Sequence, residues 1–286
     1  MTQTDKDPAD RIAFQGLAGA YSHLACNQAY GHLDPLPCVS FEATFEAVAN
    51  GVAALAMIPI ENSVAGRVAD IHHLLPDSGL HIIAEHFQRV THQLLVVKGA
   101  TIEGLKTVHS HIHALPQCRK LIQELGLEPL VHADTAGAAA ELAASGDRTA
   151  AVIASTLAAE TYGLDILRSG VEDSDNNTTR FVIMAKEPAD PEPGDGPVMT
   201  TFVFRVRNVP AALYKALGGF ATNGVNIVKL ESYMTDGAFT ATQFYADIEG
   251  HPSDESVRLA FEELGFFTRT VKLLGVYPAN PFRRQE

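Results

Sequence analysis

The sequence predicts an α/β protein with a larger domain of mostly parallel sheet, followed by a smaller ferredoxin-like domain. Over residues 11–187, short apolar runs alternate with helical patterns, as they do in open α/β sheets. Residues 188–197 are rich in proline and glycine, which is typical of a linker. Over residues 198–280 the pattern changes to strand, helix, strand, strand, helix, strand, the βαββαβ order.

Start and stop signals bound several elements of the first domain. Ser40 is an N-cap for a helix over residues 41–50, and Pro116 fits the first turn of a helix that ends before Gly126. Asp134 or Thr135 caps an alanine-rich helix. The other expected helices cover residues 22–30, 67–75 and 155–162. The expected strands cover residues 11–15, 52–58 and 150–153, and residues 80–97 are rich in strand formers.

In the second domain, signals for strands and helices also alternate. Pro210 lies in the first turn of an expected helix, and Asp236-Gly237 is a turn signal between two strands. Its expected helices cover residues 210–220 and 253–264, and its expected strands cover residues 199–206, 226–234, 239–248 and 268–276. Because ferredoxin-like folds support many functions, this order alone does not indicate one.

The composition is that of a globular protein with a sizeable core, since 46% of the residues are hydrophobic and 19% are charged. The formal net charge of -13 would repel a phosphate backbone, so no nucleic-acid partner is expected. No apolar stretch approaches the roughly 20 residues that a membrane-spanning helix needs. A small anionic substrate is compatible with this charge if donors in a local pocket bind it.

Neither the cysteines nor the N-terminal residues indicate a secreted protein. Cys26, Cys38 and Cys118 lie far apart and form no C-x-x-C pair, which argues against a disulfide framework or a cysteine zinc site. Residues 1–10 lack the basic start and apolar run of a secretory signal. We therefore expect a cytoplasmic protein with reduced thiols.

Polar residues follow or interrupt several expected strands, and ligands of open α/β sheets bind just beyond strand ends. Residues 59–63 (Pro-Ile-Glu-Asn-Ser) follow the strand at 52–58 and form either a donor cluster for a carboxylate or a capped loop. Residues 91–93 (Thr-His-Gln) interrupt an apolar run, as expected of a crossover between two lobes or of an exposed edge strand.

Residues 177–181 (Asn-Thr-Thr-Arg-Phe) precede the last expected strand of the first domain. Two hydroxyls and a guanidinium within three residues suit a carboxylate or a leaving hydroxyl, although an ordinary strand start with an exposed arginine is the alternative. In a strand, Thr178 and Arg180 would face one side, and Thr179 and Phe181 the other.

Histidines at positions 109, 111 and 113 suggest a metal site, because a strand would place all three on one face. A helix begins directly afterwards, however, and no Asp or Glu completes a ligand set. We favour an anion site at that helix N-terminus, with Ser110 and His111. No Ser-His-Asp order, phosphate-binding glycine loop or carboxylate pair is evident, so neither a metal nor a cofactor is expected.

Six segments, in this order, resemble conserved blocks of the prephenate dehydratase family, and the resemblance covers nearly the whole chain from Ile12. One such motif would be weak, whereas six collinear ones followed by an ACT-like βαββαβ domain are highly specific. The segments are Gly16 to Ser22, Pro59 to Gly66, Thr91 to Leu94, Ser110-His111 with Ala114-Leu115, Asp134 to Gly137, and Asn177 to Phe181.

The resemblance implies a catalytic domain of two lobes similar to periplasmic binding proteins, with the active site between them. It implies the conversion of prephenate to phenylpyruvate, water and carbon dioxide in phenylalanine biosynthesis, with Thr179 as the catalytic threonine. A threonine hydroxyl is a poor acid, so it would relay a proton or stabilise the charge on the departing hydroxyl. The implied substrate-binding residues are Asn62, Ser63, Thr91, Ser110, His111, His113, Thr178, Arg180 and Phe181.

The chain departs from the family pattern at two places. His113 stands where a glutamine is usual, and an imidazole titrates near neutral pH, so pH-dependent binding is a hypothesis. In the ACT-like domain, the family holds phenylalanine with a G-A-L and an E-S-R-P segment. Here the corresponding effector-binding residues are Ala211, Ala212, Leu213, Glu231 and Ser232, followed by Tyr233 in place of the arginine.

Two other functions stay open. The first is the same chemistry on arogenate, which differs from prephenate by an amino group in place of the keto group. The second is a non-catalytic amino-acid sensor with a binding cleft and a regulatory domain. ACT-like domains commonly pair edge to edge, so the resemblance also implies a homodimer or homotetramer, with L-phenylalanine as a possible effector.

Overall fold

The computed structural model describes residues 7–234 and 241–284, which form two compact units. The first unit contains the described residues up to Val68 together with His86–Phe181. The second contains Ala69–Glu85 together with the described residues from Val182 onward. The second unit is therefore discontinuous in sequence. The predicted turn at Asp236-Gly237 lies outside the described residues.

Sheet A forms one lobe of the first unit, except that His81–Glu85 of β5 and Val182–Ala185 of β11 belong to the second unit. Its strand order is β2-β1-β3-β11-β5, with β4 paired to β3, and β1 runs parallel to both β2 and β3. Helices α1 and α2 connect these parallel strands, and Ser40 caps α2 as predicted, its Oγ accepting from Ala43 N at 3.2 Å. The elements are β1 (Arg11–Gln15), α1 (Tyr21–Ala29), β2 (Asp34–Cys38), α2 (Phe41–Ala49), β3 (Leu55–Asn62), β4 (Gly66–Arg67), β5 (His81–Arg89) and β11 (Thr178–Ala185).

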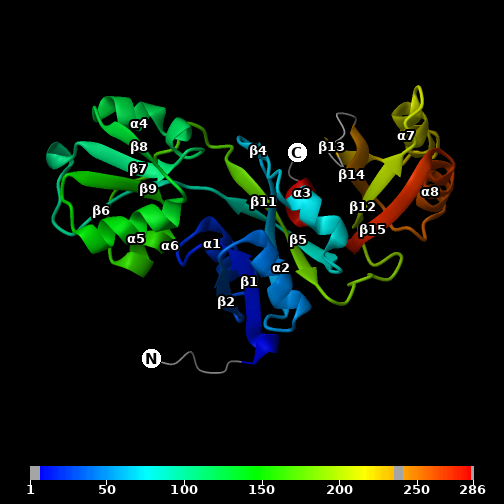
Figure 1. The fold of residues 1–286 in the computed structure, drawn as a ribbon, viewed down its shortest axis with the longest axis horizontal. Helices are drawn as coiled ribbons and strands as arrows, with labels where there is room; N and C mark the ends of the chain where they lie inside the picture. Colours follow the sequence, from blue (N-terminus) through cyan, green and yellow to red (C-terminus); the bar gives the residue numbers. More distant parts are fainter. Residues whose placement is uncertain (1–6, 235–240, 285–286) are drawn as a thin grey trace. The chain divides into compact units, whose positions relative to one another are not determined.

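Sheet B forms the other lobe of the first unit, in the strand order β10-β6-β9-β7-β8 (Figure 1). Strand β7 runs parallel to β8 and β9, whereas β6 is antiparallel to β9 and β10. Aliphatic side chains of these strands and of α5 form one buried core. The elements are β6 (Gln93–Val96), β7 (Thr107–His111), α4 (Arg119–Glu124), β8 (Glu128–His132), α5 (Thr135–Ser145), β9 (Ala150–Ala154), α6 (Thr156–Tyr162) and β10 (Asp165–Ser169).

The chain crosses between the two lobes twice. It leaves sheet A after β5 and enters sheet B at β6 through residues 90–92, and it returns between β10 and β11 through residues 170–177. The crossover interpretation of Thr91-His92-Gln93 is therefore confirmed, and an edge strand is excluded for it. Both crossing segments carry polar side chains to the place where the lobes meet.

The second unit has the βαββαβ order predicted from the sequence. Its sheet, sheet C, has the strand order β13-β14-β12-β15, and helices α7 and α8 pack on one face over a core rich in phenylalanine (Figure 1). The elements are β12 (Val198–Val206), α7 (Ala212–Thr222), β13 (Ile227–Met234), β14 (Ala241–Glu249), α8 (Glu255–Phe267) and β15 (Thr268–Pro278), and α3 (Ile71–Leu74) also belongs to this unit.

Several predicted elements differ from the structure. The helix expected over residues 67–75 is wrong over its first half, because Arg67 pairs with Glu61 across the β3–β4 turn and only Ile71–Leu74 are α-helical. The region rich in strand formers over residues 80–97 contains two strands, β5 and β6, which belong to different sheets. Strand β7, which the following helix signal had made doubtful, does form. None of the helices in the described part of the chain has the length and apolar character needed to cross a bilayer.

Candidate active site

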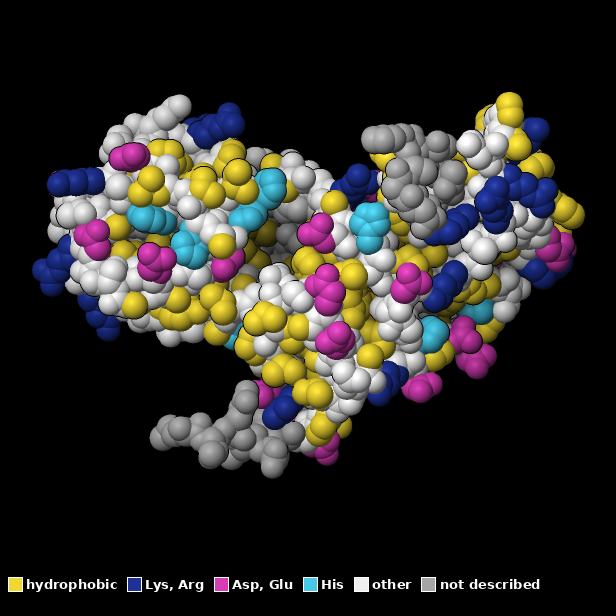
Figure 2. All heavy atoms as spheres, in the orientation of Figure 1, with side chains coloured by type: hydrophobic (Ala, Val, Ile, Leu, Met, Phe, Trp, Pro, Cys, Tyr) yellow, Lys and Arg dark blue, Asp and Glu magenta, His cyan; other side chains and the backbone are white. Residues whose placement is uncertain are grey.

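A cavity of about 380 Å³ lies between the two lobes of the first unit. Asn62 at the end of β3, together with Thr179 and Phe181 of β11, lines it from sheet A, and His111 at the end of β7 and Gln117 line it from the other lobe. Figure 2 shows a recess beside the histidine side chains of the lobe that lies at the left. The position beyond strand ends is the one at which open α/β sheets bind ligands.

The hydroxyl of Thr179 is oriented by the side chain of Asn62. The backbone N–H groups of Val64 and Ala65 donate to Asn62 Oδ1 at 3.0 and 2.8 Å, so the NH₂ end of this amide points the other way. Asn62 Nδ2 donates to Thr179 Oγ1 at 2.9 Å. Because the Thr179 oxygen accepts this bond, its own proton can be directed into the cavity.

The same amide begins a chain of hydrogen bonds whose directions are all fixed. Asn62 Nδ2 also donates to Asn177 Oδ1 at 2.7 Å, which leaves Asn177 Nδ2 to donate to Gln117 Oε1 at 2.5 Å. His92 Nε2 lies 3.2 Å from the same Gln117 oxygen and must therefore carry a proton. His92 Nδ1 then accepts from the Tyr21 hydroxyl at 2.7 Å. The chain links both lobes to Thr179.

The titratable members of this chain are held neutral by burial. Burial lowers the pKa of His92, while the bond to Gln117 and the charge of Glu172 act in the opposite direction. Burial also raises the pKa of the Tyr21 phenol well above its usual value. A neutral His92 has one donor and one acceptor nitrogen, which is what the bonds to Gln117 and Tyr21 require.

The glycine loop at residues 16–20 is held against the sheet B lobe. The hydroxyl of Ser155 donates to Gly19 O at 2.5 Å, and the hydroxyl of Tyr162 donates to Ala18 O at 2.8 Å. Gly19 has a φ of 88°, and a Cβ there would lie 2.8 Å from the Cα of Ala158. Only glycine fits this close approach without displacing the backbone of α6.

The N-terminus of α1 is directed at the cavity. Its N-cap is Ala20, which makes no side-chain capping bond, and Ala20, Tyr21 and Ser22 all line the cavity. The first N–H groups of a helix carry a partial positive charge and bind anions. Together with the hydroxyl of Ser22, this end of α1 offers a place for a carboxylate.

The two predicted histidines at 111 and 113 both line the cavity, with ring centroids 5.2 Å apart. Partial burial lowers the pKa of His111, nearby His113 lowers it further, and Asp134 opposes both effects. His109 does not join them, because it contacts Thr107 at 3.2 Å and lines a separate cavity beside His132. Among the described residues, no cluster of three or more His, Cys, Asp or Glu side chains is arranged to hold a metal ion.

Four predicted hydroxyl residues lie outside the lining of this cavity, namely Ser63, Thr91, Ser110 and Thr178. Ser110 is fully buried and its Oγ donates to Ile153 O at 2.6 Å. Its hydroxyl proton is therefore used in a hydrogen bond within sheet B. Ser63 donates to Asn176 O and accepts from Thr178 N at 2.9 Å, so it fastens the β3 end to the returning crossover. The carbonyl of Thr91, not its side chain, lies 3.1 Å from the Tyr21 hydroxyl.

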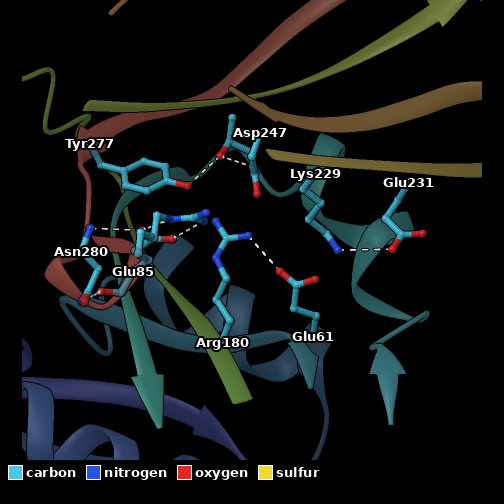
Figure 3. Close-up of polar contacts among 10 residues, drawn as sticks. Glu61, Glu85, Arg180, Lys229, Glu231, Asp247, Tyr277 and Asn280 are labelled. Carbon is cyan, nitrogen blue, oxygen red and sulfur yellow. Dashed lines mark hydrogen bonds and ion pairs between the residues drawn. The ribbon is translucent and has the colours of Figure 1, made fainter. Parts of the chain in front are cut away.

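Arg180 and Thr178 face the side of β11 away from the cavity, while Thr179 and Phe181 face the cavity, as the strand alternation requires. The side chain of Arg180 is 4% exposed and its Nη1 donates to Glu61 at 3.1 Å (Figure 3). Both partners come from strands that carry cavity residues. This ion pair therefore holds β3 and β11 in register beneath the site.

Sequence reasoning missed Gln117, Asn177 and Tyr21 as site residues. Gln117 had a signal that could have been used, because it is an amide between buried Leu115 and buried Cys118, and a polar side chain in such a turn needs a partner. The bonds of Asn177 and Tyr21 to the side chains of this chain join residues 60 or more positions apart, and spacing along the sequence does not reveal such pairs.

The predicted effector residues lie in the second unit. Ala211 precedes α7 with a φ of 59°, a left-handed conformation that favours the glycine found there in the family and costs alanine about 1 kcal/mol. Leu213 packs against the core of this unit, and Ala212 is buried beside it. On β13, Glu231 pairs with Lys229 at 3.2 Å (Figure 3), and Ser232 follows it.

The model of the family described as prephenate dehydratase matches residues 12–189, more than half of the chain. This chain belongs to the prephenate dehydratase family. Membership supports dehydratase activity for this enzyme. It also agrees with the cavity, since Asn62, Thr179 and the neutral donors around them all lie in the matched segment.

Relatives and solved structures cover almost the whole chain. A bifunctional N-acyl-homoserine lactone acylase/prephenate dehydratase of Komagataeibacter europaeus is 54% identical over 96% of this chain and 98% of its own. The arogenate dehydratase/prephenate dehydratase 1 of Arabidopsis thaliana is 38% identical over 97% of this chain and 74% of its own. The structure of an Arthrobacter aurescens prephenate dehydratase in complex with L-Phe has 30% identity and a TM-score of 0.86, over 94% of this chain and 90% of its own.

Proposed function

We propose that this protein is a prephenate dehydratase that converts prephenate to phenylpyruvate, water and carbon dioxide, with Thr179 as the catalytic residue. The observation that carries the proposal is the bond from Asn62 to the Thr179 oxygen, which turns the threonine proton toward the cavity. A donor so placed can stabilise a hydroxyl that leaves a bound ring. The location of Thr179 between two lobes provides the enclosure.

The reaction needs little more than orientation and one donor. As the C–O bond to the ring hydroxyl breaks, the ring carboxylate is released as carbon dioxide, and the electron pair of its C–C bond completes the aromatic ring. The departing hydroxide takes up a proton and leaves as water. Aromatisation supplies the driving force, so the protein has to bind a dianion, align it and stabilise the negative charge that develops on the leaving oxygen.

Neutral donors bind the substrate in this proposal. Among the described residues, no lysine or arginine lines the cavity, and its polar lining is formed by amides, hydroxyls, imidazoles and one carboxylate. This carboxylate belongs to Asp134, whose Oδ1 accepts from Gly137 N at 2.6 Å as the N-cap of α5. One carboxylate would accept from the N-terminus of α1 and from Ser22, and His113 would bind the other. Asn62, His111 and Phe181 would complete the walls that fix the ring.

The remaining predicted residues act by positioning in this proposal. Ser63 and Thr178 fasten the crossover that carries Asn177, and Arg180 holds β11 against β3. Ser110 sets the end of β7, from which His111 projects. The carbonyl of Thr91 contacts the Tyr21 hydroxyl at 3.1 Å.

The decisive experiment is to incubate the purified full chain with prephenate and with arogenate side by side and to measure phenylpyruvate and phenylalanine. We expect phenylpyruvate from prephenate at a higher kcat/KM than phenylalanine from arogenate. A preference for arogenate would make the protein an arogenate dehydratase. Binding of an amino acid without turnover of either substrate would favour the non-catalytic sensor and remove the proposal.

A second candidate activity rests on the relative of Komagataeibacter europaeus, which is named as a bifunctional acylase and is 54% identical over 96% of this chain. We propose N-acyl-homoserine lactone acylase activity as this second candidate, to be assayed with the purified chain. Release of homoserine lactone by the wild-type protein, in proportion to enzyme, would support this second activity. Complete absence of release would remove it without affecting the dehydratase proposal.

We propose the following organisation around this activity. Residues 11–187 form the catalytic domain, residues 188–197 the linker and residues 198–280 an ACT-like regulatory domain. β13 is an edge strand of sheet C, with Val228 and Leu230 both 37% exposed, which supports edge-to-edge pairing into a homodimer or homotetramer. L-phenylalanine is the proposed effector and the cytoplasm the proposed location.

A further inference from the structure

A second and larger cavity, of about 850 Å³, lies entirely within the second unit. On one side it is bounded by the face of sheet C opposite the helices, because Arg205 and Gln243 line it while their neighbours Phe204 and Phe244 belong to the helix-packed core. On the other side it is bounded by the segment that carries His73 and Asp77. None of the catalytic residues proposed above lines it.

The charge of this cavity is opposite to that of the chain. Among the described residues, its lining contains the guanidinium of Arg205 and the ammonium of Lys272 but one carboxylate, that of Asp77. The whole chain carries a formal charge of -13. Two cations beside one acid leave a local excess of positive charge, and such a concentration in a recess attracts small anions.

A directed hydrogen-bond network fixes the donors of the cavity. Arg205 Nε donates to Gln243 Oε1 at 2.5 Å, so the other end of that amide must donate, and Gln243 Nε2 lies 2.7 Å from the Tyr233 hydroxyl. The Tyr233 oxygen accepts this bond and can direct its own proton elsewhere. The bond to Gln243 orients the planar head of the guanidinium.

The cavity also offers an apolar surface. Val203 and Met234 line it, and the ring of His73 meets the ring of Tyr233 edge-on, with centroids 5.6 Å apart. Burial raises the pKa of Tyr233, which keeps the phenol protonated and able to donate. The ammonium of Lys272 donates to the carbonyl of Pro76, which anchors it without neutralising its charge.

We propose that this cavity is a second ligand site of the protein, which binds a small carboxylate with an apolar body through Arg205, Lys272 and the hydroxyl of Tyr233. The positive excess selects a net anion over a zwitterion, and the apolar surface selects an organic carboxylate over an inorganic anion. The site is separate from the interlobe cavity and from the predicted effector residues Ala211 to Leu213, Glu231 and Ser232, although it includes Tyr233, which directly follows Ser232 on β13.

The test is calorimetric binding of three probes to the full chain. The probes 3-phenylpropanoate and L-phenylalanine differ by one ammonium group, and inorganic phosphate carries charge without an apolar body. We expect 3-phenylpropanoate to bind at least tenfold more tightly than either of the others. In Arg205→Gln its affinity should fall at least tenfold, because a charge-assisted contact is lost. Arg269→Gln, which removes an exposed charge from β15 outside the cavity, should change it less than twofold.

Tyr233→Phe gives an independent check that is separate from folding. It removes one hydroxyl from the cavity, so the affinity for 3-phenylpropanoate should fall about threefold to tenfold. Equal binding to wild type, Arg205→Gln and Tyr233→Phe would overturn the proposal, because the probe would then bind elsewhere. Tighter binding of L-phenylalanine or of phosphate, lost in Arg205→Gln, would overturn the ligand class. The readout is binding, so it does not depend on whether prephenate is turned over.

Discussion

The two proposed anion sites of this protein differ in the kind of hydrogen-bond donor that they offer. In the first unit the donors are neutral, and a chain of amides from Asn62 to Gln117 fixes their directions. In the second unit the donors include two cations, and one amide, Gln243, orients Arg205. The hydrogen bond from a fixed neutral donor strengthens as negative charge develops on the leaving group. Two cations, by contrast, attract an anion equally before and after a reaction. The first arrangement suits turnover and the second suits binding.

The largest effect should come from replacing the amide of Asn62 in the first cavity with a carboxylate. In Asn62→Asp the side chain keeps its shape but loses the N–H that donates to Thr179 Oγ1, so the threonine proton would turn toward the new carboxylate. We expect kcat for prephenate to fall by about a hundredfold or more. Asn176→Asp places the same charge on the exposed crossover and should keep most of the activity. Comparable losses in both variants would mean that charge, not donor direction, decides.

Ser110 distinguishes a positioning role from a ligand role. Its hydroxyl is fully buried and donates to Ile153 O at 2.6 Å, so Ser110→Ala leaves that carbonyl short of a partner. The free energy of unfolding should fall by about 1 to 2 kcal/mol in denaturant titrations. The KM for prephenate should stay within about twofold. A large rise in KM at unchanged stability would mean that Ser110 binds the substrate directly.

His113→Lys should make the first cavity more like the second. An ammonium in the lining adds the cation that this cavity otherwise lacks among its described residues, so the substrate dianion should bind more tightly. We expect the Kd to fall about threefold to tenfold, measured in a slowly reacting Thr179→Ala background. His113→Gln restores the amide usual in the family and should bind within about twofold of the unsubstituted position. Equal affinity in all three proteins would refute a substrate contact at position 113.

The smallest expected effect is the contribution of His92 to the pH dependence of stability. Burial lowers its pKa in the folded protein, so the unfolded chain binds the proton first as the pH falls. The contribution is fully present above the ordinary histidine pKa of about 6.5 and is lost as the pH falls from there toward the folded value. Denaturant titrations between pH 7.5 and 5.5 should show a shallower loss for His92→Gln than for wild type. The exposed His32→Gln should behave as wild type.

The fold was predictable wherever local signals and periodicity agreed. The βαββαβ order of the second unit followed from alternation and turn signals, and Ser40 capped α2 as expected. Strand β2 was missed because Pro35 and Pro37 argue against a strand, yet it lies at the edge of sheet A, where a missing N–H is tolerated. The helix over residues 67–75 failed because pairing across the β3–β4 turn outweighed helix propensity.

The motif residues of the candidate site were predictable from the sequence, whereas their hydrogen-bond partners were not. Asn62, Thr179, His111 and His113 do meet in one cavity, although they come from three separate segments. Which hydroxyls face a ligand depends on partners far away in the chain, such as Ile153 for Ser110. A motif names such residues together, and the folded structure separates those that line the cavity from those that hold its walls.

Comparing kcat and substrate Kd in Thr179→Ala, Thr179→Ser and Thr178→Ala decides whether the Thr179 hydroxyl is catalytic. Thr179→Ser keeps the hydroxyl, and Thr178→Ala alters the neighbour that lies outside the lining of the cavity. We expect Thr179→Ala to lower kcat for prephenate at least a hundredfold while Kd changes less than about threefold, and the other two variants to retain most of the turnover. Unchanged turnover in Thr179→Ala would contradict this role.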